Sequence, residues 1–150
     1  MPACLAVFVH PDDERFTQYI GKTITTPLGI KVPILADDKV KMDKGTGVVM
    51  CCSYGDEVDV YRVQKHNLSE KIVINRYGKM QDCGVPEIEG MKISEAREKI
   101  MELFEAQGLV VKRDPITQAK QISERGKVPV EILPVKQRFV NLLDKKDILL

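Results

Sequence analysis

Residues that build metal sites and disulfide frameworks are scarce in this sequence of 150 residues. It has two histidines, His10 and His66, which lie far apart in the chain and have no neighbouring ligands at metal-binding spacing. None of the four cysteines forms a CxxC pair, and the adjacent Cys51 and Cys52 would point to opposite faces of a strand. We therefore expect no metal site and no disulfide framework, but reduced thiols in a cytosolic compartment.

Long hydrophobic runs and an excess of one charge are also missing. No run approaches the ~18 apolar residues that a membrane span needs, and the first residues lack the basic region of a signal peptide. The 23 Lys and Arg residues and the 22 Asp and Glu residues give a net charge of +1, which neither demands nor excludes a nucleic-acid partner. We expect a cytoplasmic globular protein without membrane contact, forming one domain over residues 1–150.

Short apolar runs separated by turn residues predict a mixed α+β domain. Helices are predicted at about residues 56–68 and 94–107, the second with Ser94 as its N-cap and Gly108 as its C-terminal stop. A hairpin is predicted in which Pro33 pushes the second strand to the sheet edge. About seven short strands are expected, at residues 4–10, 22–26, 31–35, 71–75, 109–112 and 128–133 and within the stretch 45–59.

The most informative stretch is residues 45–59, with the sequence GTGVVMCCSYGDEVD. A glycine-flanked turn leads into a β-prone run, which breaks at Tyr54 and Gly55. Two carboxylates, Asp56 and Asp59, follow three residues apart, where a helix should begin. A strand, a sharp turn and acids at a helix N-terminus form an arrangement that points polar groups at a ligand rather than into a core.

The same residues have simpler structural explanations. Asp56 suits a helix N-cap as well as it suits a ligand, and Asp59 taken alone suits a solvated acid in a first helical turn. Gly45 and Gly47 are explained equally well by a tight turn. The adjacent Cys51 and Cys52 are explained by small core positions. The cations of the C-terminal third suit solvated loops better than contacts with RNA phosphates; they are Lys112, Arg113, Lys120, Arg125 and Lys127.

Several blocks of the chain, in the right order, resemble the valyl-tRNA synthetase family. They are HPDDER at residues 10–15, VPILAD at 32–37, GTGVVM at 45–50 and PVEILPVKQRF at 129–139. The similar region is the editing domain inserted into the class I catalytic fold, and the spacing of Asp56 and Asp59 after Gly55 resembles the archaeal-type branch. The resemblance implies the mixed, β-barrel-like editing domain of class I aminoacyl-tRNA synthetases, with residues from about 128 to 150 returning to the catalytic core.

The chain departs from the family pattern at three points. The family's threonine-rich motif should lie just upstream of Pro2, so we expect a domain trimmed at its N-terminus, and weak or inactive in isolation. Arg138 stands where the return segment usually carries tryptophan, a residue that the chain lacks altogether. The class I nucleotide motifs are missing, which implies no cofactor in this domain and leaves ATP to the absent catalytic domain.

The resemblance implies hydrolysis of threonine wrongly esterified to valine tRNA, as part of a valine–tRNA ligase. Threonine and valine are nearly isosteric, and weak rejection of threonine by this family's synthetic site is a standard example of why a second, editing site is needed. The implied partners are the tRNA acceptor end, the mischarged threonine and the catalytic core of the parent synthetase. A free-standing deacylase acting in trans, or a non-catalytic module that only grips the acceptor end, are the alternative functions.

The implied site centres on two carboxylates. Asp59 is the leading candidate for holding the substrate's α-ammonium or its hydroxyl, and Asp56 shares the task; which acid meets which group stays open. Position near a helix N-terminus should favour the ionised form of Asp59. A positioned water, aided by the terminal hydroxyl of the tRNA, would attack the ester, so we expect no cysteine nucleophile.

Five further residues are implied in substrate binding. Cys52 and Tyr54 fall at pocket-lining positions by similarity. The turn formed by Gly45, Thr46 and Gly47 would let the backbone of the terminal adenosine approach closely.

Overall fold

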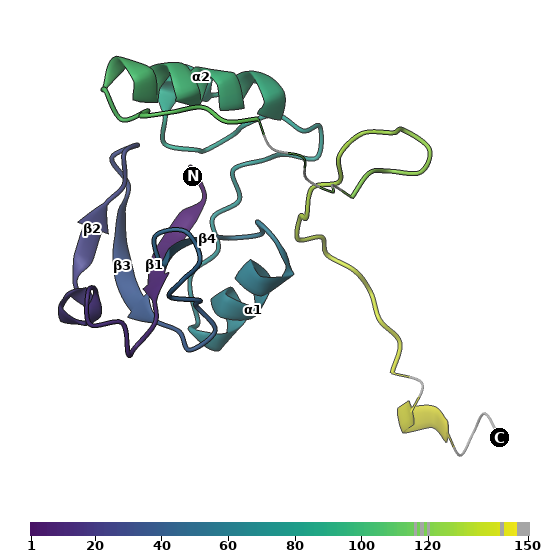
Figure 1. The fold of residues 1–150 in the computed structure, drawn as a ribbon. Coiled ribbons are helices and arrows are strands. Elements are labelled where there is room, and N and C mark those ends of the chain that lie inside the picture. Colours follow the sequence, from purple (N-terminus) through teal and green to yellow (C-terminus); the bar gives the residue numbers. More distant parts are fainter. Residues whose placement is uncertain (116, 118, 120, 142, 147–150) are drawn as a thin grey trace.

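The sheet of the protein is mixed and has four strands. The computed structural model describes residues 1–115, 117, 119, 121–141 and 143–146. The strands lie in the order β2-β3-β1-β4, with β1 at Cys4–Val9, β2 at Thr23–Thr25, β3 at Lys31–Ala36 and β4 at Val48–Cys52 (Figure 1). β1 pairs parallel with β3 and antiparallel with β4, and β2 pairs antiparallel with β3. Together with the helices below, this confirms the predicted α+β class and the predicted hairpin.

This sheet is not closed into a barrel. β2 and β4 are its two edges, and in the described part of the chain they do not pair with each other. Closure would require the two edge strands to pair, and the four short strands form an open sheet instead. The β-barrel-like form expected from the resemblance is therefore not found in the described residues.

β1 is buried on both faces, which explains its nearly continuous apolar sequence. Ala6 and Phe8 pack toward α1 (Glu57–Lys65), whereas Val7 and Val9 pack into a second cluster on the opposite face. A shift of the register between Cys4 and Ala6 lets Cys4 join the Val7 side instead of following strict alternation.

A third cluster lies under α2 (Ile93–Ala106), which crosses the end of the sheet where β1 begins (Figure 1). Ala96 is its buried helical residue, and it packs with Ile88 of the short 3₁₀ turn η2 (Pro86–Ile88). The predicted N-cap Ser94 is wrong, because the helix begins one residue before it with Lys92 as the cap. The Glu95 carboxylate accepts the backbone N–H of Lys92 at 3.2 Å. This interaction stabilises a helix start at Ile93, one residue earlier in the chain than Ser94.

Gly108 ends α2, as predicted. Its φ of 69° is left-handed, and the following Leu109 donates its N–H to the carbonyl of Phe104 at 2.9 Å. Two further 3₁₀ turns are short: η1 at Thr17–Tyr19 and η3 at Leu143–Lys145.

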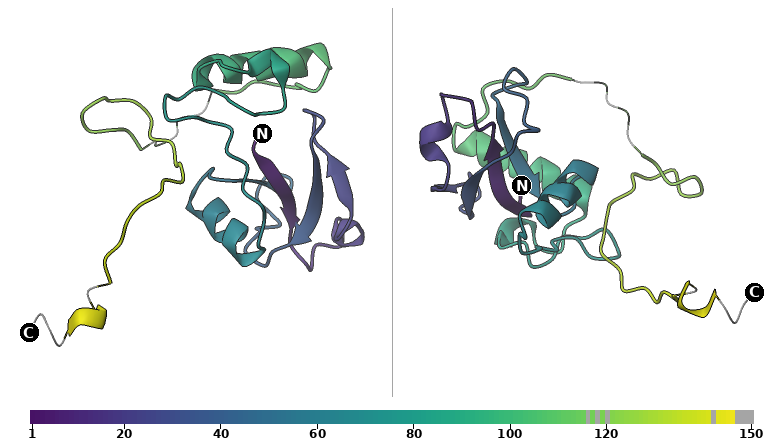
Figure 2. Two further views of the ribbon diagram at one scale, coloured as in Figure 1. Left: turned by 180° about the vertical axis from the view of Figure 1, so that it is seen from behind. Right: turned by 90° about the horizontal axis from the view of Figure 1, so that it is seen from below.

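Three predicted strands are not found. Residues 71–75 and 128–133 each contribute one isolated bridge, Ile74 with Met80 and Pro129 with Ile122, and residues 109–112 form no strand. In the described residues these two C-terminal runs do not pair with either sheet edge, β2 or β4, and Val111 is 100% exposed. Figure 2 shows the yellow, C-terminal part of the chain leading away from the sheet in both views.

The prediction that Pro33 places its strand at the sheet edge is also wrong. β3 lies between β2 and β1. Ile34 donates its N–H to the carbonyl of Lys22 at 2.8 Å, so the nitrogen of Pro33, one residue earlier, points away from β2. The pairing with β1 begins only at Ile34, and the missing N–H therefore falls outside that ladder.

Candidate functional site

The turn between β4 and α1 holds the predicted pair of carboxylates. Asp56 is the N-cap of α1: its backbone is extended and its Oδ1 accepts the N–H of Asp59 at 2.8 Å. The cap satisfies a backbone donor that the first turn of a helix leaves without a partner. The strand, turn and helix predicted for residues 45–59 are thus confirmed, and so is the N-cap explanation of Asp56.

Asp59 is not a solvated acid. The residue is 8% exposed, and its Oδ2 accepts the backbone N–H of Cys52 at 3.1 Å. Gly55 makes this position possible, because a Cβ on that residue would overlap with Asp59 Oδ2. The carboxylate is therefore held between the last residue of β4 and the side-chain-free surface of Gly55.

Burial changes the acidity of Asp59. Removal from water raises its pKa, the Cys52 N–H lowers it, and the nearby charge of Asp56 raises it again, with a net increase above the usual value. The helix N-terminus is expected to favour the ionised form, but burial and the Asp56 charge outweigh the lowering contacts and shift the pKa upward. A cation bound at this carboxylate would lower its pKa again.

A cavity of about 280 Å³ opens beside this turn. Cys52, Tyr54 and Gly55 line it, whereas Asp59 lies behind Gly55 and is not a lining residue. Its other walls come from the start of β1, residues 71–74, α2 and the segment 131–133. The volume lies just below the ~300–1,000 Å³ range of ligand sites, so the cavity suits an amino-acid side chain better than a nucleotide.

Tyr54 carries a phenol beside an acid. Its hydroxyl is close to the Glu70 carboxylate, and this contact, with a smaller contribution from burial, raises the pKa of Tyr54 to about 12. The phenol stays protonated near neutral pH and can donate a hydrogen bond.

The turn at Gly45, Thr46 and Gly47 is not brought to this cavity. It precedes β4, whereas Cys52 ends that strand, and five residues of extended chain separate them by about 16 Å. Gly47 instead packs on another group: with its φ of 77°, a Cβ there would lie 2.7 Å from the guanidinium of Arg15 and 3.0 Å from the carbonyl of Met42. The structure gives this glycine a packing role.

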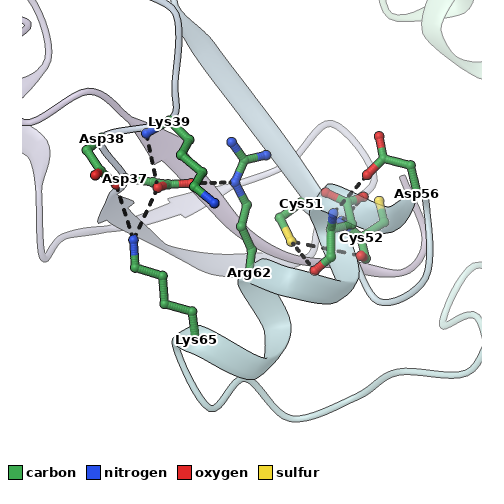
Figure 3. A network of polar contacts seen from close by, with 9 residues as sticks. Asp37, Asp38, Lys39, Cys51, Cys52, Asp56, Arg62 and Lys65 are labelled. Carbon is green, nitrogen blue, oxygen red and sulfur yellow. Dashed lines mark hydrogen bonds and ion pairs between the residues drawn. The ribbon is translucent and has the colours of Figure 1, made fainter.

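A buried ion pair fixes the other end of α1. Arg62 Nε donates to Asp37 Oδ2 at 2.6 Å, and both side chains are almost fully buried. Lys65 adds contacts to Asp37 at 3.4 Å and to Asp38 at 3.2 Å. Figure 3 shows Arg62 between these acids and the cluster of Cys51, Cys52 and Asp56. The pair orients the helix that carries Asp59.

The thiols are poor nucleophiles in this environment. Burial raises the pKa of Cys4 to about 11 and that of Cys51 to about 12, so both stay protonated near neutral pH. Burial also raises the pKa of Cys52. Among the described residues, no group of three or more His, Cys, Asp or Glu side chains is placed to hold a metal ion. Nor does the described chain contain a helix long and apolar enough to cross a membrane.

Three cavity residues were missed by sequence reasoning. Arg97 projects from α2, and Lys71 donates its Nζ to the carbonyl of Cys83 at 3.2 Å. Ser53 is 1% exposed, and its Oγ accepts the N–H of Lys71 at 2.7 Å. Nothing in the local sequence marks these residues, because their proximity depends on where α2 crosses the end of the sheet.

Two of the five C-terminal cations form ion pairs with acids in the described part of the chain. Lys112 pairs with Asp114 at 2.8 Å and Arg113 pairs with Glu105 at 2.9 Å, all with exposed side chains. Lys120 lies outside the described residues.

The chain is similar to part of several valine–tRNA ligases. It is 44% identical over 151 residues to that of Rickettsia felis, which covers 100% of the chain and 18% of the ligase. Identity is 42% over 158 residues to the Ehrlichia canis ligase and 36% over 204 residues to that of Wolbachia pipientis, covering 20% and 24% of those proteins. The chain thus spans about a fifth of the length of these relatives. No family model matches it.

Proposed function

The chain is homologous over its whole length to a segment of the valine–tRNA ligases, and we propose that it is the editing domain of such an enzyme. In this proposal it hydrolyses threonine esterified to tRNA(Val), while ATP-dependent charging takes place elsewhere in the ligase. Residues from about 128 onward lead back to the catalytic core. The enzyme acts in the cytoplasm, with the tRNA acceptor end as its partner.

One observation carries the proposal: a buried carboxylate lies directly behind a glycine wall of a small cavity. Asp59 is held by the Cys52 N–H, and Gly55 is the wall between its Oδ2 and the cavity. A structural N-cap acid would lie over the helix end in solvent, as Asp56 does. Burial of a second acid at this place is costly unless a cationic partner joins it.

The α-ammonium of an aminoacyl ester is a suitable partner. Because Asp59 does not line the cavity, the Gly55 turn would have to shift to open its carboxylate; Asp59 would then accept a charge-assisted hydrogen bond from the ammonium and fix the ester carbonyl. Asp56 keeps one carboxylate oxygen beyond its cap contact, and Tyr54 offers a protonated hydroxyl; either can bind the threonine hydroxyl. Valine leaves these polar groups without that partner, which is how the site would reject it.

Hydrolysis in this site needs positioning rather than a protein nucleophile. Cys52 is the cysteine that lines the cavity, and burial raises its pKa, so we take a water molecule as the nucleophile. The terminal hydroxyl of the tRNA would orient that water, and fixing the ester by its ammonium group lowers the entropy lost in the attack. The glycine turn at residues 45–47 is too distant to line the same cavity, and we place it outside the reacting centre.

The proposal is tested by comparing hydrolysis of Thr-tRNA(Val) and Val-tRNA(Val), by this chain and by the ligase that contains it. Faster release of threonine than of valine supports editing. Tight tRNA binding with no release of either amino acid, in both proteins, would instead identify a non-catalytic docking module. Activity of the isolated chain equal to that of the ligase would favour a deacylase that acts in trans.

A further inference from the structure

Arg97 borders two adjoining hollows. It lines the cavity of about 280 Å³ and also a wider groove of about 700 Å³, and Gly55, Glu131 and Ile132 line both as well. The groove runs past Gly55, Asp56 and Glu57 at the start of α1 and along residues 129–132. Because the groove and the cavity share lining residues, the groove offers a place for the nucleotide of a substrate whose aminoacyl group fills the cavity.

The groove is otherwise acidic. Among its described lining residues, Asp56, Glu57 and Glu131 are negative and Arg97 is the one cation. An RNA backbone entering the groove would be repelled by the acids and attracted only by this guanidinium. Arginine suits the task because its planar fork of N–H groups matches the oxygens of a phosphate.

The present partner of Arg97 is weakly held. Its guanidinium lies 3.7 Å from the Glu131 carboxylate, and the two side chains are 59% and 34% exposed. An ion pair of this length and exposure contributes little to stability and exchanges readily. Glu131 belongs to a segment with no regular strand or helix, whereas Arg97 follows the buried Ala96 on α2. If Arg97 exchanges Glu131 for another anion, the segment that carries Glu131 would therefore move, while Arg97 would stay in place on α2.

We propose that Arg97 is a substrate-positioning residue that exchanges the Glu131 carboxylate for a backbone phosphate of the bound RNA end. The segment 129–132 then acts as a competing acidic strap across the groove, which the RNA displaces. This inference rests on the proposed editing function for the identity of the RNA, but its phosphate contact is measurable without hydrolysis.

The test is the salt dependence of binding of uncharged tRNA(Val) transcript to the full chain and to Arg97→Ala. Loss of one phosphate contact should lower the slope of log affinity against log salt by about one, and weaken binding about tenfold or more at low salt. Arg97→Lys should keep the slope, because the charge remains, with affinity between the two. Glu131→Gln should bind about two- to fivefold more tightly, since it removes the competitor.

The matched control is Lys99→Ala. Lys99 is on the same helix, carries the same charge and pairs with Glu102 at 2.9 Å, but lines neither the cavity nor the groove. An equal change of slope in Lys99→Ala, an unchanged slope in Arg97→Ala, or no measurable binding by the wild-type chain would overturn the inference. Urea unfolding of each variant separates misfolding from loss of the contact.

Hydrolysis of Thr-tRNA(Val) decides the proposed function separately. If wild type hydrolyses the ester, Arg97→Ala should raise KM and leave kcat nearly unchanged, because the phosphate contact is made before and during reaction alike. If the wild-type chain binds tRNA(Val) but does not hydrolyse Thr-tRNA(Val), the editing proposal fails. The salt dependence of tRNA binding still decides whether Arg97 contacts a phosphate.

Discussion

The carboxylate of Asp59 and the backbone N–H of Cys52 are joined by a hydrogen bond of 3.1 Å. This contact ties the first turn of α1 to the last residue of β4, and it places a buried acid behind the glycine wall of the cavity. The site is thus a property of the junction between strand and helix. Changes that move the junction should alter stability and chemistry together.

Gly55→Ala should disturb the junction directly. The added Cβ would overlap with Asp59 Oδ2, and overpacking of this kind costs about 1–3 kcal/mol. We expect urea unfolding to show this loss. Gly126→Ala is the control, because its Cβ would meet Val128 Cγ2 at an ordinary 3.5 Å. Equal stability of both variants would show that Asp59 is free to move away from Gly55.

Arg62→Leu should destabilise the fold strongly. It leaves the buried Asp37 carboxylate without its main partner, a change that costs about 3–5 kcal/mol. The double variant Asp37→Leu and Arg62→Leu should recover much of that loss, because no unpaired charge remains buried. A double-mutant cycle by chemical denaturation measures both, and strictly additive losses would contradict a coupled pair.

Acid should weaken the fold through Asp37. Burial alone would raise its pKa, but the hydrogen bonds from Arg62 and the Lys39 backbone outweigh it and lower the pKa from 3.8 to about 2. A lowered pKa contributes stability above pH 3.8, and this is lost as the pH falls toward 2, on the order of 2 kcal/mol.

The measurement is urea unfolding from pH 5 to about pH 2. Asp37→Asn should flatten the decline in that window, whereas Asp38→Asn, with its side chain 74% exposed, should not. The raised pKa of Asp59 has the opposite sign: its stability contribution is lost as the pH rises above 3.8. If the stability of Asp37→Asn falls as much between pH 5 and about pH 2 as that of wild type, other carboxylates cause the loss.

Gly47→Ala should lower stability without abolishing the chemistry of the cavity. Its left-handed φ of 77° and its contacts with Arg15 and Met42 leave no room for a Cβ. Gly45→Ala shares the left-handed backbone, at a φ of 61°, but has open space around it, so it should lose less. A fall of kcat for ester hydrolysis in both variants, with unchanged stability, would show that this turn takes part in the reaction.

The sequence predicted local structure well where it carried strong local signals. The apolar run of β1, the glycine stop of α2 and the acids after Gly55 were each recognisable from residue type and spacing. It failed where the outcome depends on partners distant in the chain. Residues 109–112 have β-prone side chains but pair with neither edge of the sheet, and the burial of Asp59 follows from contact with Gly55 and Cys52. The role of Arg97 could not be predicted for the same reason, because it reaches the cavity only where α2 crosses the end of the sheet.

The most direct test of the account is single-turnover hydrolysis of Thr-tRNA(Val) by the ligase that carries this segment, with Asp59→Asn compared with wild type. Removing the charge that holds the substrate ammonium should slow ester hydrolysis about 10- to 100-fold, while charging with valine persists. Asp12→Asn, a loss of charge at a side chain 84% exposed, should hydrolyse like wild type. Wild-type hydrolysis by a folded Asp59→Asn protein would contradict the central role given to this carboxylate.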